Sequence, residues 1–315
     1  MHHHFEPTVY HNTMGRHEPV LTVASGDRLT TTTVDAWGLD AERQQVATRG
    51  NPMTGPFAVA GAAPGDVLAV TIESIVPNRS YGFTKTAVAP HIVDPSYVTA
   101  LPAVELVEWT IDTAAATVTL MTPHPAPLRG LILPLDPMLG CFGVAPPRGQ
   151  SISTATSGEW GGNMDYRQLG PGATVYFPVF KPGGLFYLGD AHAVQGDGEI
   201  SGNGVEISTT TTVRFEVLKG WKTSWPRFER EEWFGTLGNA RPLDQAVQHA
   251  TTEMLRWLSE PAIGLDSLSA NLLLQQTVRY DLGNVFDPAY TMVCKLSRSI
   301  LRKAGLPDSV RGGGP

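Results

Sequence analysis

Glycine and proline are frequent in this chain and are spread along its whole length. There are 33 Gly and 25 Pro, together 58 of the 315 residues. They follow no fixed period, so they indicate many turns and not a repeat architecture. Turns at this density favour a β-rich protein.

Composition and charge narrow the range of partners. Apolar residues make up 42% of the chain, enough for the core of one large domain or two modest ones. The net charge is −7 with only 23 basic residues, which argues against nucleic-acid binding because phosphate contacts need clustered Lys and Arg. A small substrate with little or no charge fits better.

Cysteine use and hydropathy indicate the compartment. Cys141 and Cys294 lie far apart in the sequence and suggest neither a disulfide framework nor a thiolate metal site. No apolar run approaches the roughly 18 to 20 residues that span a bilayer, and the N-terminus does not resemble a signal peptide. We therefore expect a cytoplasmic protein without a membrane partner.

Alternating apolar and polar residues predict several strands. Leu68, Val70 and Ile72 fall on one face of an extended segment at residues 67–76. Residues 19–34, where a Gly-containing turn joins two β-branched runs, predict a hairpin. Further strand signals occur at residues 116–121, 174–180, 185–188 and 204–218.

The C-terminal quarter changes to a helical period. Leu243, Val247, Ala250, Met254 and Trp257 recur at helical spacing, and helix-prone stretches follow at residues 265–278 and 292–304. The predicted organisation is a β-rich catalytic region at residues 1–235 and an α-helical portion packed on it at residues 236–315. The run His2-His3-His4 is either native or the remnant of a purification tag.

The densest group of potential metal ligands lies in residues 189–199. Asp190, His192, Gln195, Asp197 and Glu199 follow directly on the apolar segment 185–188. If extended geometry persists, Asp190 and His192 share one face and can converge on one ion. Carboxylate and imidazole without thiolate suit catalytic zinc, with calcium as the alternative. These residues can equally be ordinary turn residues.

Other polar positions are weaker candidates. Asp165 of Gly161-Gly162-Asn163-Met164-Asp165 can act as a ligand from a neighbouring loop, or can form an Asx turn or cap a helix. His11 and Asp35 are residue types that a metal site recruits, and each can instead be structural. Cys141 in a Gly-flanked turn is either a nucleophile or a small buried apolar residue.

Several segments together resemble the acetamidase/formamidase family. They are PVLTVASGD, NPMTGPFAVAGAAPGD, PMLGCFGVAP, GGNMD, and GDAHAVQGDGE with the following GNGVEI, and they occur in order from about residue 10 to residue 220. The resemblance implies hydrolysis of short amides to ammonia and a carboxylate. It also implies a mainly β fold, a jelly-roll-like sandwich with a smaller α+β part and C-terminal helices, assembled as a homo-oligomer.

The resemblance further implies a divalent metal near Asp165, Asp190, His192 and Glu199, with His11 as a weaker carry-over. Where some relatives have a Glu-bearing GExG turn, this chain has Gly140-Cys141-Phe142-Gly143, which puts a carboxylate role there in doubt.

On this basis we hypothesise metal-dependent hydrolysis of a small linear amide. Asp190 and His192 hold the metal, with Asp165 and His11 completing the shell, and Glu199 is the general base. Asn163 or backbone amides bind the oxyanion. One alternative is a cysteine amidase that uses Cys141, and another is a non-catalytic β-sandwich, stabilised by metal, that binds a small ligand.

Overall fold

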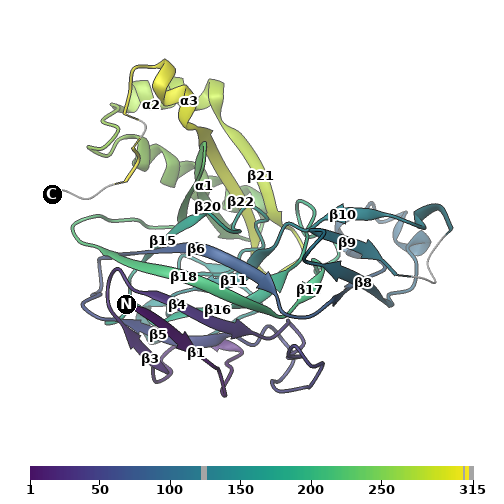
Figure 1. Ribbon diagram of the computed structural model, residues 1–315. Helices are drawn as coiled ribbons and strands as arrows, with labels where there is room; N and C mark the ends of the chain where they lie inside the picture. The colour runs from purple at the N-terminus through teal and green to yellow at the C-terminus, as the bar shows by residue number, and fades with distance from the viewer. Residues whose placement is uncertain (122–125, 308, 312–315) are drawn as a thin grey trace.

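The computed structural model describes residues 1–121, 126–307 and 309–311. In this part of the chain most regular structure is β, arranged in two large sheets and one short strand pair, with the α-helices near the C-terminus (Figure 1). The mainly β fold predicted from the sequence is confirmed. The jelly-roll connectivity stays a prediction.

The first sheet joins the N-terminal, middle and C-terminal parts of the chain. Its strand order is β1 (His2–Phe5), β4 (Arg28–Thr33), β18 (Thr209–Leu218), β6 (Val67–Pro77), β15 (Thr174–Pro178), β19 (Arg227–Arg230), β20 (Trp233–Ala240), β22 (Tyr290–Ser297) and β21 (Arg279–Asn284).

The second sheet carries the segment with the potential ligands at its centre. Its order is β10 (Ile132–Pro134), β9 (Thr117–Leu120), β8 (Leu106–Asp112), β7 (Tyr81–Lys85), β17 (Glu206–Ile207), β16 (Phe186–His192), β11 (Met138–Gly143), β14 (Gly161–Asn163) and β13 (Ser157–Gly158). In addition, β5 (Thr54–Val59) pairs with β16 and with β3 (Leu21–Val23). The short pair is β2 (Thr13–Met14) with β12 (Ile152–Ser153). The 3₁₀ turns are Pro90–Ile92, Val98–Ala100, Ala126–Leu128 and Pro147–Gly149.

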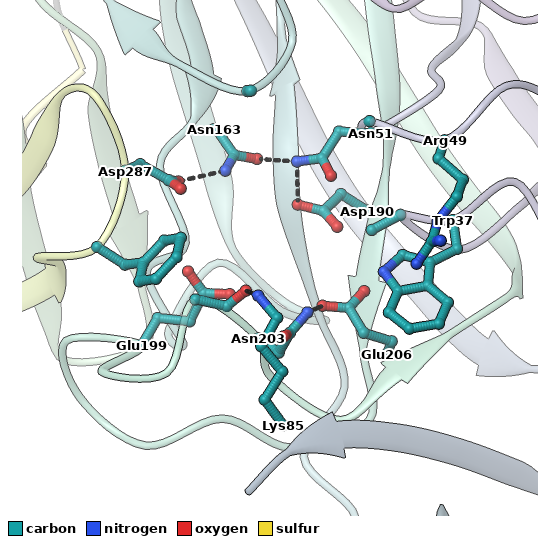
Figure 2. A pocket seen from close by; sticks show the side chains of 15 residues that line it. Trp37, Arg49, Asn51, Lys85, Asn163, Asp190, Glu199, Asn203, Glu206 and Asp287 are labelled. Atoms are coloured by element: carbon teal, nitrogen blue, oxygen red, sulfur yellow. Dashed lines mark hydrogen bonds between the residues drawn. The ribbon is translucent and has the colours of Figure 1, made fainter. Parts of the chain in front are cut away.

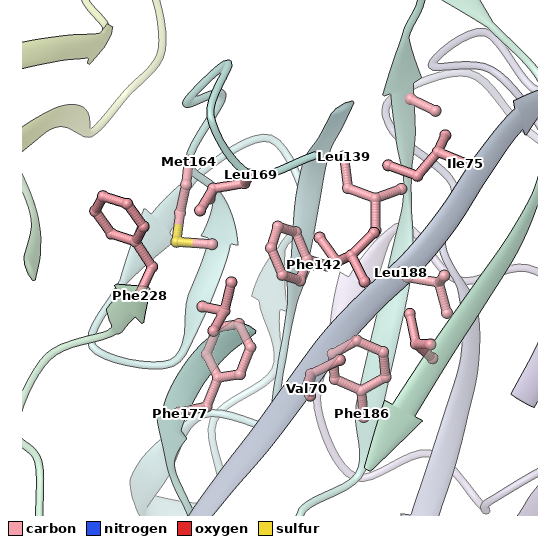
Figure 3. Packing of buried hydrophobic residues seen from close by; sticks show 14 of the residues in the cluster. Val70, Ile75, Leu139, Phe142, Met164, Leu169, Phe177, Phe186, Leu188 and Phe228 are labelled. Atoms are coloured by element: carbon pink, nitrogen blue, oxygen red, sulfur yellow. The ribbon is translucent and has the colours of Figure 1, made fainter. Parts of the chain in front are cut away.

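Apolar side chains from both sheets form the main core (Figure 3). The Phe142 ring of β11 meets the Phe177 ring of β15 edge-on, with centroids 5.6 Å apart. Phe186 of β16 meets Phe215 of β18 in the same way at 5.4 Å. These contacts cross between the sheets and show that they pack as a sandwich, because each strand places alternate residues on its inner face.

The predicted hairpin at residues 19–34 is wrong in its pairing. Both strands form, but β3 pairs in parallel with β5 in the second sheet, whereas β4 pairs with β1 and β18 in the first. The turn between them closes when Asp27 accepts a hydrogen bond from the Ala24 amide at 2.9 Å. It therefore connects the two layers of the sandwich, because both strands have apolar faces to bury in the same core.

The sequence predicts an α-helical portion at residues 236–315, but the structure places strands there as well as helices. Helices α1 (Leu243–Leu258) and α2 (Ser267–Thr277) confirm two of the expected helices, but only α3 (Arg298–Lys303) remains of the third. Residues 290–297 instead form β22, which pairs with β20 along its whole length. A short apolar segment is compatible with both the helical and the strand period. Here it forms a strand because it pairs with β20. The division at residue 235 stays a prediction, and β20 runs across it.

Helix α1 covers the C-terminal end of the first sheet (Figure 1). It buries Met254, Trp257 and Leu258 in a second core with Phe234 of β20 and Leu296 of β22. Trp257 also donates a hydrogen bond from Nε1 to the Val310 carbonyl at 2.7 Å. This hydrogen bond ties the segment at Val310 to α1. We call β20, β21, β22 and the helices α1, α2 and α3 the C-terminal module.

The N-terminal histidines belong to the fold. His2, His3 and His4 form β1, which pairs in parallel with β4, and Phe5 packs edge-on against Phe57 of the core. Among the described residues, no helix has the length and apolarity needed to cross a membrane.

We expect Phe142→Ala to lower the free energy of unfolding by about 3–5 kcal/mol, because it removes a fully buried ring between the sheets. Urea denaturation followed by intrinsic fluorescence measures the change. Leu268→Ala on α2 is the control, since this side chain is 70% exposed and its loss should change stability by less than about 0.5 kcal/mol. Equal effects of the two variants would contradict the assigned core.

Candidate active site

Strand β16 brings Asp190 and His192 to one place. Both side chains are buried, and His192 Nε2 lies 3.6 Å from Asp190 Oδ1. This agrees with the expectation that residues two apart on a strand share a face. Glu206 on the neighbouring strand β17 is in register with His192, and its Oε1 lies 3.3 Å from Nε2. An imidazole nitrogen therefore faces two carboxylates.

The His192 ring is fixed from its other side. Its Nδ1 is 2.8 Å from Gln195 Oε1, and Gln195 Nε2 donates to the Asp165 carbonyl at 2.6 Å. Because the amide nitrogen of Gln195 is committed to that carbonyl, its oxygen accepts from Nδ1–H. Gly204 leaves room for the ring, since a Cβ there would lie 2.5 Å from it. Nε2 is consequently the nitrogen that faces the two carboxylates, and this buried atom has no hydrogen-bond partner.

A second group of carboxylates meets at Asn284. This fully buried residue ends β21, and its Nδ2 lies 2.8 Å from Asp165 Oδ2, Glu199 Oε2 and Asp287 Oδ2. Its Oδ1 accepts from the amides of Phe286 and Asp287. One amide side chain from the C-terminal module thus holds together three acids from three separate loops.

The same residues are held in an unusual backbone conformation. Asp165, Asp190 and Glu199 have φ angles of 44°, 52° and 45°, in the left-handed region. Side chains other than Gly adopt this region at a cost, and such strain gathers at functional sites. Gly140 of β11 lies beside Asp190 of the neighbouring strand β16. A Cβ on Gly140 would lie 2.3 Å from Asp165 Oδ1 and 2.9 Å from Asp190 Oδ2.

Burial and mutual repulsion make these acids hard to ionise. Burial, and then the charges of Asp165 and Asp287, raise the pKa of Glu199 well above its usual value. Burial likewise raises the pKa of Asp165 and Asp190, and that of Asp287 to about 6. Burial alone would lower the pKa of His192, but Glu206 and Asp190 outweigh it and raise that pKa. The cluster therefore favours a bound positive charge.

A pocket of about 220 Å³ opens onto the cluster (Figure 2). Asp190, Glu199, Glu206 and Asp287 line it, together with Asn163. A hydrogen-bonded chain crosses one wall. Asn163 donates to Asp287, and Asn51 Nδ2 donates to Asn163 Oδ1 at 2.8 Å and to Asp190 Oδ2 at 3.0 Å. The acids are thus reachable from the pocket.

The ligand atoms form two overlapping groups. One comprises Asp165, His192 and Glu199, and the other Asp190, His192 and Glu206, with each group's atoms within 4.8 Å of one another. Of the residues predicted from the sequence, Asp165, Asp190, His192 and Glu199 come together, with Asn163 on the pocket wall. Their roles as ligands, base and oxyanion donor stay predictions.

His11 and Asp35 are placed elsewhere. Among the described residues His11 belongs to neither group, and its ring stacks on His17 with centroids 3.8 Å apart. Asp35 forms a buried ion pair with Arg79 at 2.7 Å, and its Oδ1 accepts from the amides of Trp37 and Leu39. Within the described residues, neither side chain belongs to either group of ligand atoms.

Sequence reasoning missed Glu206, Asn284 and Asp287. Glu206 lies between Val205 and Ile207, an alternation that placed it on the polar face of a strand, and only pairing with β16 buries it. Asn284 and Asp287 lie between the two helices expected at residues 265–278 and 292–304, where the sequence predicted only a connection. Nothing near them in the sequence signals that this loop reaches the site.

Comparison with known proteins identifies the family of this chain. Residues 10–150 and 148–234 match a protein-family model described as the Acetamidase/Formamidase family. The chain belongs to the acetamidase/formamidase family. Two solved structures resemble it over almost its full length. A recombinant predicted acetamidase/formamidase from Thermoanaerobacter tengcongensis is 30% identical, with a TM-score of 0.84 and 99% of each chain covered. The acetamidase from Yersinia enterocolitica is 32% identical, with a TM-score of 0.83 and 96% and 93% covered.

Among curated proteins, a "Putative formamidase" of Schizosaccharomyces pombe is 28% identical over 220 residues, covering 55% of this chain and 53% of that protein. The match therefore spans about half the length of this relative. The family-model match ends at residue 234, so Asn284 and Asp287 lie beyond it.

We expect Gly140→Ala to lower the free energy of unfolding by about 1–3 kcal/mol, because the added methyl displaces Asp165 and Asp190. Gly196→Ala is the matched control, since a Cβ there meets nothing within 4 Å. Thermal and urea unfolding of both variants measure the difference. A neutral Gly140→Ala would show that the acids can move apart freely.

Proposed function

We propose that this protein hydrolyses a small linear amide to ammonia and a carboxylate, with a divalent metal at the His192 cluster. Membership of the family supports the reaction class. One observation carries the proposal. The buried Nε2 of His192 has no hydrogen-bond partner and faces Asp190 and Glu206, beside a pocket that a small molecule can enter.

The residues present fit a metal ion. Besides His192 Nε2, the buried oxygens Asp165 Oδ1 and Glu206 Oε2 lack hydrogen-bond partners. Buried polar atoms without partners are costly, and several buried acids together need a counter-charge. Asp190 and Glu206 line the pocket, so we assign the ion to them and His192, with Asp165 in the neighbouring group of ligand atoms. His11 is replaced in this assignment by Glu206.

The donor set favours zinc. Zinc takes imidazole nitrogen together with carboxylate oxygen, whereas calcium prefers a shell of oxygens alone. Calcium remains the alternative at the carboxylates around Asn284. A divalent ion would polarise the amide carbonyl and lower the pKa of a water from 15.7 to about 7.

The chain's own residues supply proton transfer and orientation. Glu199 lies at the pocket, where its carboxylate form can take a proton from water. It would pass that proton to the amide nitrogen as the C–N bond breaks. Asn163 uses one Nδ2–H for Asp287, and its second can donate to the developing oxyanion. Gln195 keeps His192 in the tautomer that presents Nε2.

We expect Asp190→Ala to lose bound zinc and amide hydrolysis together, because it removes one of the three proposed ligands. Elemental analysis and an ammonia assay measure the two. Asp197→Ala is the control, since this acid of the same segment is exposed and forms an ion pair with exposed Arg167. Chelation should abolish activity as Asp190→Ala does. Unchanged zinc content in Asp190→Ala would remove the ligand role.

We expect Glu199→Gln to keep bound metal but to reduce kcat by about 10²- to 10⁴-fold, because the amide cannot accept the proton. The side chain keeps its shape and can still accept from Asn284. Metal content and steady-state kinetics on formamide and acetamide separate the roles. Full activity would exclude the base role, and loss of metal would make Glu199 a ligand instead.

The cysteine alternative is disfavoured by the surroundings of Cys141. Its side chain is fully buried, and its Sγ donates to the Thr154 carbonyl at 3.3 Å. Burial and the charges of Asp190, Asp165 and Asp287 raise the pKa of this thiol well above its usual value. A thiolate nucleophile needs the opposite environment. A cysteine amidase would resist chelation and be inactivated by iodoacetamide, the reverse of the expectation here.

The non-catalytic alternative makes a different prediction. Such a protein would lose stability on chelation but release no ammonia from any small amide. Homo-oligomeric assembly, a cytoplasmic location and the absence of nucleic-acid partners stay predictions.

A further inference from the structure

Two cationic side chains line the same pocket as the acids. Lys85 ends β7, and Arg49 lies in the loop before β5. Figure 2 shows Lys85 running up beside Asn203 towards the middle of the pocket, and Arg49 lying next to Trp37. Hydrolysis of a neutral amide at a single metal ion does not require either cation.

Both cations have only weak partners. Lys85 Nζ is 3.4 Å from the Gly202 carbonyl and 5.0 Å from the centre of the Phe286 ring. The Arg49 guanidinium lies 3.8 Å above the Trp37 ring. In the described part of the chain neither forms an ion pair, although four acids line the same pocket. By contrast, buried Arg79 and Arg227 each have a carboxylate at 2.7 Å.

The charges in the pocket are therefore separated. The acids converge on His192 and Asn284, and Asn203 Nδ2 donates to Glu206 Oε1 at 2.9 Å, which helps to hold that acid towards the cluster. The Lys85 ammonium retains donors for another group, since an ammonium has three. An anion bound there in partly desolvated surroundings gains a charge-assisted hydrogen bond.

The pocket is also larger than a molecule of formamide or acetamide requires. Its volume is about 220 Å³. At about 30 Å³ for a water-sized group, this space holds on the order of seven non-hydrogen atoms, and acetamide fills about half of it.

We propose that the pocket selects a short amide that also carries a carboxylate, such as oxamate, malonamate or succinamate. Lys85 binds the carboxylate, and Arg49, stacked on Trp37, adds a second positive charge. The amide end lies among Asp190, Glu199 and Glu206. This inference rests on the proposed amide hydrolysis and names its substrate class.

The test compares charged and neutral amides of matched length. For the wild type, kcat/KM for malonamate over propionamide, and for succinamate over butyramide, should exceed one. Lys85→Met should lower that ratio by at least about tenfold, the effect of losing a hydrogen bond between charged groups. Arg49→Gln should lower it less. Lys222→Met, an exposed cation outside the pocket, should leave the ratio unchanged.

Each outcome has a separate meaning. Equal turnover of charged and neutral amides by the wild type would overturn this inference while leaving amide hydrolysis intact. A fall in kcat on all amides with an unchanged ratio would make Lys85 a counter-charge for the acids, which also overturns it. Without turnover of any amide the proposed function fails. The subsite is then decided by whether malonamate raises the Tm of wild type more than that of Lys85→Met.

Discussion

Burial of one imidazole among carboxylates is the constraint that organises this protein. His192 Nε2 faces Asp190 and Glu206 without a hydrogen-bond partner, in a position shut off from solvent. Such an arrangement is unfavourable without a compensating cation, because low-polarity surroundings strengthen repulsion between the acids. The packing of the sandwich holds these residues in position. Inter-sheet packing holds β16 and β11 in place, and Gln195 and Gly204 fix the ring.

The C-terminal module completes the site instead of merely packing beside it. Asn284 contacts Asp165, Glu199 and Asp287 with one amide nitrogen. The end of β21 thereby holds acids of the sandwich in position. Main-chain bonds from Gly198 to Leu282 and from Val285 to Gly198 reinforce this junction. The two parts therefore meet through polar contacts at the place where the chemistry is proposed.

Opposite charges share one small pocket without neutralising each other. Hydrogen bonds from Asn51, Asn203 and Asn284 hold acids towards the cluster, while Lys85 and Arg49 rest on Phe286 and Trp37. Neutral amide side chains thus do the positioning that ion pairs do elsewhere in the molecule, as between Arg79 and Asp35. This separation leaves room for a ligand with two unlike ends.

The sequence by itself determined the mainly β fold, several strands, among them β6, β15, β16 and β18, and two helices, because alternation and helical spacing are local properties. It also brought Asp190 and His192 together, since residues two apart on a strand share a face. Tertiary structure decided the rest. It split residues 19–34 between two sheets, made residues 290–297 a strand and excluded His11 from the cluster. It alone added Glu206, Asn284 and Asp287, because their approach depends on strand pairing and on a loop distant in sequence.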